Sequence, residues 1–312
     1  MPSLLILSRH ADAYRRLIEA ARLPHLTIVS ATDASDIPSA ARECGMVLGE
    51  PSLVARAIAN LPKVTWVQST WAGVEPLLDP ALRRDYVLTN ARGVFGDLMS
   101  EYVFGYILVR ERHVLEKYAS QQQRKWDPTP PGTLRGKQIG LLGVGSIGAA
   151  LARTAKHFGM RVKGYTRVSE ECPDVDIYFH GSDRAAFAAD LDYLVCVLPN
   201  TTETKHLIDR ALLDALPARA VFINPGRGSV VDETALAEAL QSGRLAGAIL
   251  DVFQREPLPP DHVFWRTPNV IVTSHTAALS APEDIAPVFI DNYRRLTSGA
   301  PLNHRVEFER GY

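Results

Sequence analysis

Short apolar runs alternate with amphipathic helical patterns along nearly the whole chain. In the first third, the apolar runs predict buried strands at 3–8, 26–30, 45–49 and 64–69. The stretches 12–22 and 52–61 lie between these runs and have the periodicity of amphipathic helices. Strands that alternate with helices in this way predict βαβ units and a parallel sheet.

The rest of the chain continues this arrangement. A long helix is predicted at 97–123, and three prolines and two glycines in the segment 125–137 then break the pattern. Six further apolar runs predict strands before a last helix at 281–299, and these runs lie at 138–143, 161–166, 193–199, 220–225, 247–252 and 270–274. The runs are almost continuously apolar, as expected of strands covered on both faces. Because 312 residues are long for one core, the pattern predicts an α/β protein with two domains.

Composition and charge narrow the classes of partner. The formal net charge is −1, so no basic excess points to nucleic acid. The cysteines Cys44, Cys172 and Cys196 have no C-x-x-C spacing, which argues against a zinc site and a disulfide framework. We find no signal-peptide pattern and no apolar run as long as a membrane span. The expectation is a cytoplasmic protein that binds no nucleic acid, no membrane and no metal.

A glycine motif follows the predicted strand at 138–143. Gly143, Gly145 and Gly148 have G-x-G-x-x-G spacing, directly after a strand and at the start of a helical pattern. That context is typical of dinucleotide binding, because the glycines allow a tight turn and a close approach of the pyrophosphate. Ser146 and Ile147 are placed to donate backbone N–H groups from the start of the helix.

The next strand indicates which dinucleotide is bound. NAD-binding domains place an acid about 20 residues after the motif, where it binds the ribose 2′-hydroxyl. This chain has Thr166 and Arg167 there, and Glu170 and Glu171 lie further on. A 2′-phosphate suits a hydroxyl and a guanidinium, so we expect NADP(H) to be preferred and NAD(H) to be possible. The alternative is that Arg167 is only a solvated loop residue.

Three chemically active side chains follow three successive strands. Arg227 follows the run at 220–225, Glu256 follows 247–252, and His275 follows 270–274. In a doubly wound sheet the carboxyl ends of the strands meet at the ligand site. An arginine binds a carboxylate, a histidine transfers a proton near neutral pH, and a glutamate orients the histidine. With a nicotinamide these groups suit reduction of a 2-keto acid.

The motifs "GLLGVGSIG", "LPNTTETKHLI", "FINPGRGSVVDETAL", "LDVFQREPLPPDHVFW" and "VTSHTAA" resemble those of the D-isomer-specific 2-hydroxyacid dehydrogenases. The run "LDVFQREPLPP" and the ending "RGY" look most like the glyoxylate/hydroxypyruvate reductase A branch. The resemblance implies two Rossmann-like, doubly wound domains. Residues 1–95 with 287–312 would form a flavodoxin-like substrate domain, and 96–286 would form the NAD(P)-binding Rossmann domain. It also implies a homodimer built through the cofactor domains, with the active site in the cleft.

The resemblance also implies residue roles. Arg227, Glu256 and His275 match the catalytic residues, and Asp251 matches the residue that binds the nicotinamide carboxamide. The remaining matches are the substrate loop, at Trp71, Ala72, Gly73 and Val74, and the loop bordering the cofactor, at Pro199 and Thr204. One departure is Gly226, where alanine or serine is commoner, and it is expected to loosen the loop that carries Arg227.

Two other functions compete with a reductase of small 2-keto acids that yields D-2-hydroxy acids. One is a cofactor-sensing, non-catalytic protein of the same superfamily, which the retained catalytic residues do not exclude. The other is a formate dehydrogenase, which would carry glutamine at the position of Glu256. A metal-dependent alcohol dehydrogenase is disfavoured because cysteine ligands are lacking.

Overall fold

The computed structural model describes residues 2–311. The chain divides into two compact units, and each is described by itself. One unit contains the residues up to Val94 and those from Ser280 onward, and the other is the continuous segment Phe95–Leu279. The second domain boundary lies between Leu279 and Ser280, earlier than the predicted 286/287. The whole of helix α9 (Pro282–Ser298) therefore belongs to the discontinuous unit.

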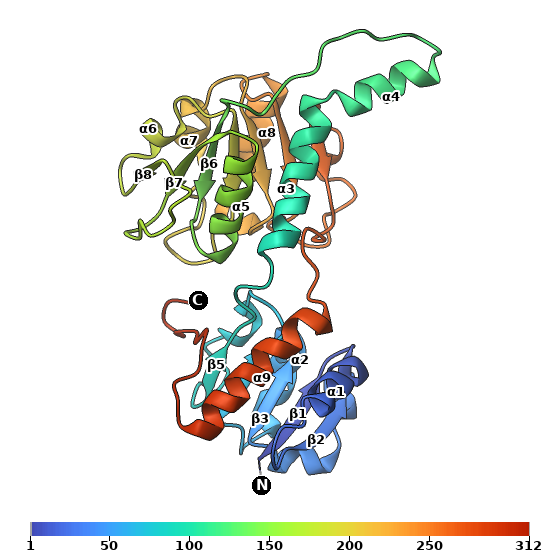
Figure 1. Cartoon of the computed structure of the whole chain (residues 1–312), viewed down its shortest axis with the longest axis vertical. Helices are drawn as coiled ribbons and strands as arrows, with labels where there is room; N and C mark the ends of the chain where they lie inside the picture. Colours follow the sequence, from blue (N-terminus) through green and yellow to red (C-terminus); the bar gives the residue numbers. More distant parts are fainter. Residues whose placement is uncertain (1, 312) are drawn as a thin grey trace. The chain divides into compact units, whose positions relative to one another are not determined.

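The discontinuous unit is built on a five-stranded parallel sheet with the order β2-β1-β3-β4-β5. This is the flavodoxin-like strand order, as the resemblance implied. Helices α1 and α9 pack against each other (Figure 1). The strands are β1 (Ser3–Leu7), β2 (Thr27–Ala31), β3 (Met46–Gly49), β4 (Trp66–Ser69) and β5 (Val87–Thr89), and the other helices are α1 (Ala11–Ala20) and α2 (Pro51–Ala57).

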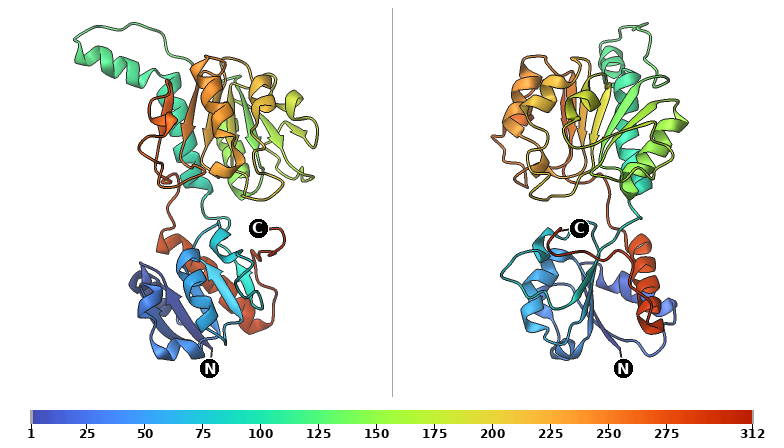
Figure 2. Two further views of the ribbon diagram at one scale, coloured as in Figure 1. Left: turned by 180° about the vertical axis from the view of Figure 1, so that it is seen from behind. Right: turned by 90° about the vertical axis from the view of Figure 1, so that its left-hand side faces the viewer.

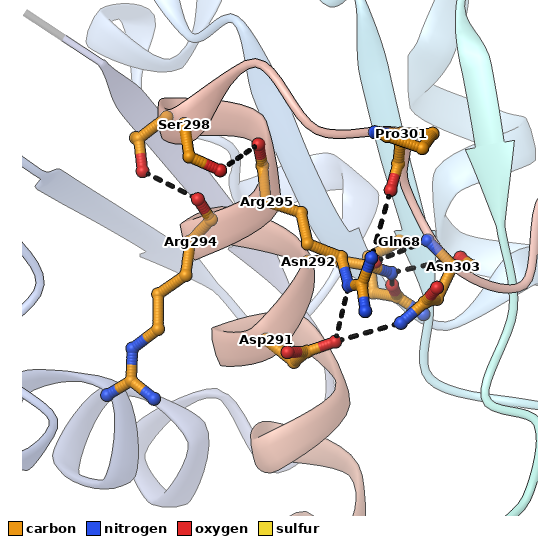
Figure 3. A network of polar contacts seen from close by, with 9 residues as sticks. Gln68, Asp291, Asn292, Arg294, Arg295, Ser298, Pro301 and Asn303 are labelled. Carbon is orange, nitrogen blue, oxygen red and sulfur yellow. Dashed lines mark hydrogen bonds and ion pairs between the residues drawn. The ribbon is translucent and has the colours of Figure 1, made fainter.

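A buried polar network joins α9 to strand β4 (Figure 3). The Asn292 side-chain amide donates to Gln68 Oε1 at 3.0 Å, and Asn292 Oδ1 accepts from the Asn303 N–H at 2.8 Å. Gln68 Oε1 also accepts from the Thr89 hydroxyl, and Gln68 Nε2 donates to the Ser69 carbonyl. Asn292 and Gln68 are fully buried, so their amides cannot bond to water. The hydrogen bonds within the network take the place of those bonds. The last helix is therefore held by buried hydrogen bonds against the sheet that the first third of the chain forms.

The continuous unit contains a seven-stranded parallel sheet with the order β12-β11-β10-β9-β6-β7-β8. The strand order reverses between β6 and β9, which is where such sheets bind ligands. Helices α3 and α5 lie on one face of the sheet and α6, α7 and α8 on the other (Figure 2). A buried apolar cluster lies between the sheet and each group of helices. The strands are β6 (Gln138–Leu142), β7 (Arg161–Tyr165), β8 (Ile177–Phe179), β9 (Tyr193–Cys196), β10 (Val221–Asn224), β11 (Gly247–Leu250) and β12 (Val270–Val272). The helices are α3 (Gly96–Glu111), α5 (Ser146–His157), α6 (Arg184–Ala188), α7 (Arg210–Ala215) and α8 (Glu233–Gln241).

The single helix predicted at 97–123 is wrong. Helix α3 ends at Glu111 and a second helix, α4 (Val114–Gln122), begins after His113. His113 has a φ of 52°, in the left-handed region, and a helix cannot continue through that conformation. Helix α4 and the segment after it lead away from the sheet of this unit (Figure 1).

Over residues 2–311, no helix is long and apolar enough to cross a membrane. The same part of the chain contains no cluster of three or more His, Cys, Asp or Glu side chains arranged to hold a metal ion.

Candidate active site

The glycine motif forms the turn between β6 and α5. Gly143 has a φ of +96°, which side chains disfavour. A Cβ on Gly148 would lie 2.2 Å from the Gly143 carbonyl oxygen, so only glycine allows the helix to approach the turn this closely. Gly145 and Ser146 are exposed at the start of α5, and no side chain caps that helix. The first N–H groups of α5, including those of Ser146 and Ile147, suit the phosphates of a dinucleotide.

The turn after β7 carries the predicted 2′-phosphate site. The Thr166 hydroxyl donates to the Ser169 carbonyl at 2.7 Å. Arg167 Nη1 lies 3.3 Å from Glu203 Oε2, and both side chains are exposed. A phosphate at this place would therefore compete with Glu203 for the guanidinium. The competition is modest, because exposed ion pairs contribute only about 0–1 kcal/mol.

His180 lies beside Thr166 of the turn after β7, and it was not predicted from the sequence. It follows β8, and its Nδ1 and Nε2 lie 2.9 Å from the Thr166 carbonyl and 2.7 Å from Glu170 Oε1. Both partners only accept hydrogen bonds, so the geometry favours the doubly protonated ring. The hydrogen bond to Glu170 and that to the Thr166 carbonyl raise the pKa of His180. Glu170 is one of the acids that could have bound the ribose hydroxyls of NAD. It is instead paired with His180.

Pro199 and Thr204 shape the loop that follows β9. The Thr204 hydroxyl donates to the Pro199 carbonyl at 2.7 Å and accepts from the Thr201 N–H at 2.9 Å. Both Pro199 and Thr204 are half-buried. Thr204 therefore fixes the loop at the β9 side of the switch point, beside the glycine turn.

The predicted catalytic acid–base pair is formed. His275 Nδ1 lies 2.7 Å from Glu256 Oε2, and Glu256 Oε1 accepts from the Phe253 N–H at 3.0 Å. The side chains of His275 and Glu256 are 50% and 36% exposed, so they face solvent. With Nδ1 on the glutamate, the Nε2 atom of the imidazole is directed away from it and is available for proton transfer.

The two groups of the pair shift each other's pKa. The hydrogen bond to Glu256 raises the pKa of His275, while burial and the charge of Arg227 oppose that shift. Burial raises the pKa of Glu256, but hydrogen bonds from His275 and the Phe253 N–H outweigh it, and the net pKa lies below the ordinary value. His275 therefore stays protonated to a higher pH than an isolated histidine.

Arg227 lies in the turn after β10 and contributes its charge to both members of the pair. Its Nη1 donates to the Gly226 carbonyl at 2.8 Å. A Cβ on Gly228 would lie 1.9 Å from the Phe253 carbonyl carbon, so the turn that carries Arg227 packs against the backbone that leads to Glu256. Gly226 is buried and a Cβ there would lie 2.8 Å from the Cys196 carbonyl oxygen, so glycine allows a close approach of two backbone segments at this position.

Asp251 anchors the loop that carries His275. Only 1% of its surface is exposed, and its carboxylate accepts from the N–H groups of Thr276 and Ala277 at 2.9 and 3.0 Å. The Thr273 hydroxyl donates to the same carboxylate, and the His275 N–H donates to the Asp251 carbonyl. The carboxylate is thus largely occupied by its own loop, which the motif match did not indicate.

The predicted substrate loop follows β4 in the discontinuous unit. Ser69 accepts from the Trp71 N–H and donates to the Trp71 carbonyl, both at 2.9 Å. The Asn90 amide donates to the Ala72 carbonyl at 2.9 Å. Within residues 2–311, the N–H groups of Ala72 and Gly73 have no hydrogen-bond acceptor. They are therefore suited to an anion such as a carboxylate.

Comparisons with known proteins agree with this geometry. Residues 104–277 match the family model described as "D-isomer specific 2-hydroxyacid dehydrogenase, NAD binding domain". The glyoxylate/hydroxypyruvate reductase A of Serratia proteamaculans is 33% identical over 82% of this chain and 84% of that protein. A family member from Aeromonas salmonicida is 42% identical, with a TM-score of 0.93 over 98% of this chain and 99% of that one.

A solved structure with a bound cofactor is also similar. The NADPH-dependent glyoxylate/hydroxypyruvate reductase of Sinorhizobium meliloti, in complex with NADP and sulfate, is 29% identical, with a TM-score of 0.86 over the full length of both chains. The family model covers more than half of the chain, and it covers the glycine turn and the three positions predicted to be catalytic. The chain therefore belongs to the D-isomer specific 2-hydroxyacid dehydrogenase family of NAD(P)-dependent oxidoreductases.

Proposed function

We propose that the chain is an NADPH-preferring reductase of small 2-keto acids, of the glyoxylate/hydroxypyruvate type, that forms D-2-hydroxy acids. The observation that carries this proposal is the hydrogen-bonded pair of Glu256 and His275, with Arg227 on the neighbouring strand end. The similar proteins from Serratia and Sinorhizobium are glyoxylate/hydroxypyruvate reductases, which supports this substrate class.

Each residue has a distinct role in this proposal. The Arg227 guanidinium binds the substrate carboxylate and polarises the adjacent keto group. Protonated His275 donates its Nε2 proton to the keto oxygen, and Glu256 stabilises the imidazolium before the transfer and orients the ring. In the discontinuous unit, the N–H groups of Ala72 and Gly73 are assigned to binding an anion, because no acceptor within residues 2–311 pairs with them. The cofactor, when bound, supplies the hydride to the keto carbon.

The cofactor site is assigned to residues around the switch point of the continuous unit. The glycine turn and the start of α5 would hold the pyrophosphate, and Pro199 and Thr204 would border it. Thr166 and Arg167 would bind the 2′-phosphate, because no acid stands at the end of β7 and Glu170 is paired with His180. Since Asp251 is largely occupied by its own loop, a contact with the nicotinamide carboxamide would have to use the one acceptor position that remains.

The homodimer is also a proposal. Helix α4 exposes the large apolar side chains Val114, Leu115 and Tyr118, and Trp126, in the segment after it, is 90% exposed. Exposed apolar clusters of this kind mark interaction surfaces. Sedimentation of the purified protein tests this, with Leu115→Lys as the variant expected to shift it to a monomer.

A panel of small 2-keto acids, assayed in parallel with NADPH and NADH, tests the function. The proposal requires turnover of glyoxylate or hydroxypyruvate with NADPH, and the hydroxypyruvate product should have the D configuration. Binding of NADPH without turnover of any 2-keto acid would instead support a cofactor-sensing protein.

A further inference from the structure

A tyrosine of helix α3 contacts the polar cluster beneath the His275 loop. The Tyr102 hydroxyl lies 2.9 Å from Thr273 Oγ1, and both residues are half-buried in the continuous unit. Thr273 follows β12, two positions before His275, and its hydroxyl bonds the Asp251 carboxylate. Helix α3 supplies none of the assigned site residues. Its Tyr102 is nevertheless connected, through two hydrogen bonds, to Asp251, which anchors the His275 loop.

The directions of these hydrogen bonds follow from the donors available. The Thr273 hydroxyl donates to Asp251 Oδ1, and both Asp251 oxygens also accept backbone N–H groups, Oδ1 from Thr276 and Oδ2 from Ala277. Thr273 has one hydroxyl proton, which must therefore be directed to Asp251. The remaining lone pair of Thr273 then accepts from Tyr102, which makes Tyr102 the donor at the start of a one-way chain.

This chain ends on the backbone of the catalytic loop. Three consecutive amides, those of His275, Thr276 and Ala277, donate to Asp251, to its carbonyl or to its carboxylate. His275 has a φ of 55°, in the left-handed region that residues other than glycine rarely adopt. Such a conformation persists where surrounding contacts over-determine it. The Asp251 contacts do so here, and they hold the imidazole where it meets Glu256.

We propose that Tyr102 is a positioning residue for His275 and acts through Thr273 and Asp251. The catalytic part of this inference rests on the proposed function, whereas the positioning itself exists in the protein without ligands. Tyr102 touches none of the groups assigned to chemistry, and its removal by substitution leaves the charges of Glu256, Asp251 and Arg227, which all act on His275, in place.

The test is Tyr102→Phe, with Tyr106→Phe as the matched control. Tyr106 lies one turn further along α3, its ring packs edge-to-face on Tyr102 at 4.9 Å, and its hydroxyl makes no hydrogen bond within residues 2–311. Tyr102→Phe should lower kcat roughly 2- to 10-fold, the worth of one ordinary hydrogen bond. The KM for NADPH and the dissociation constant of NADPH from fluorescence titration should stay within about twofold of wild type. Tyr106→Phe should change neither kcat nor binding.

An NMR titration of the His275 ring in the ligand-free protein gives a readout that does not depend on turnover. A loosened loop weakens the contact with Glu256, so Tyr102→Phe should lower the pKa of His275 and Tyr106→Phe should not. Thr273→Ser keeps the hydroxyl and should behave as wild type, whereas Thr273→Val should exceed the effect of Tyr102→Phe.

The inference fails if Tyr102→Phe leaves both kcat and the His275 titration unchanged, or if Tyr106→Phe reproduces its effects. It also fails if NADPH binding weakens in parallel with kcat, because Tyr102 would then act on the cofactor. If the wild-type protein reduces no 2-keto acid, the proposed function fails, and the NMR titration alone decides whether Tyr102 positions His275.

Discussion

The pairing of Glu256 with His275 predicts a specific change in pH dependence for Glu256→Gln. The glutamate accepts a 2.7 Å hydrogen bond from the ring and favours its protonated form. Hydrogen bonds to charged groups contribute about 1.5–3 kcal/mol. The two side chains are half and one third exposed, so solvent screens the pair and we take about 1 kcal/mol, or roughly a fivefold change in the protonation equilibrium.

The sign follows from the form of His275 that reacts. In the proposed mechanism, reduction uses the protonated ring, and its raised pKa keeps that form populated to higher pH. In Glu256→Gln the pKa falls, so the reductive kcat/KM should decline at a lower pH than in wild type. At pH values above the pKa of His275, the reductive kcat/KM of the variant should be roughly fivefold lower than that of wild type. Below pH 5, where His275 is protonated in both proteins, the two values should be nearly equal. Oxidation of the hydroxy acid needs the neutral ring, so its rising limb should also shift to lower pH.

The assay is kcat/KM for glyoxylate with NADPH from pH 5 to 9, together with D-glycerate oxidation over the same range. Glu233→Gln is the matched control, because Glu233 also lies beside a histidine, His262 at 3.5 Å, and the glutamine keeps the Oε1 atom that accepts from the Gln254 N–H at 2.9 Å in the loop of Glu256. It should leave both profiles unchanged. A Glu256→Gln profile that keeps the wild-type limb, or shifts it to higher pH, would refute the reasoning.

Three further substitutions test the other assignments. His275→Ala should lower kcat roughly 10²- to 10⁴-fold by removing the proton donor, and steady-state kinetics near the wild-type value would remove His275 from the mechanism. Arg227→Lys should lower kcat/KM for the keto acid at least about tenfold, since an ammonium does not reproduce the bidentate fork; unchanged kinetics would make Arg227 structural. Arg167→Ala should raise the KM for NADPH about tenfold and leave that for NADH nearly unchanged, because only the phosphate loses a charge-assisted bond; an equal loss with both cofactors would contradict the 2′-phosphate assignment.

The apolar pattern predicted most strands because parallel strands are buried on both faces and so leave long apolar runs. Strands β5 and β8, of three residues each, were missed, whereas the equally short β12 was predicted because it lies within the apolar run at 270–274. The break at His113 was also invisible, because the sequence around it continues a helical pattern and only the left-handed backbone interrupts it.

In the site, the sequence predicted the residues that follow recognised strands but not the contacts between residues far apart in the chain. Arg227, Glu256 and His275 were predicted to lie together because each stands in the segment that follows a strand, and the carboxyl ends of parallel strands meet. His180 also follows a strand, β8, but that strand was not recognised. The anchoring role of Asp251 depends on amides 25 and 26 positions away in the chain, which no local pattern reveals.

The discontinuous unit has a consequence for how the protein is made on the ribosome. Phe289 of α9 stacks on the buried Trp66 ring at 5.2 Å, and Asn292 fills the hydrogen-bonding position on Gln68. Until α9 leaves the ribosome, the sheet begun by the first third of the chain keeps an uncovered aromatic face, and Gln68 lacks the hydrogen bond from Asn292. The continuous segment Phe95–Leu279 is complete much earlier, so we expect it to fold first although it is synthesised second. Limited proteolysis of ribosome-bound chains arrested before α9 emerges should find that segment protected and the N-terminal residues cleaved, and the opposite pattern would exclude this order.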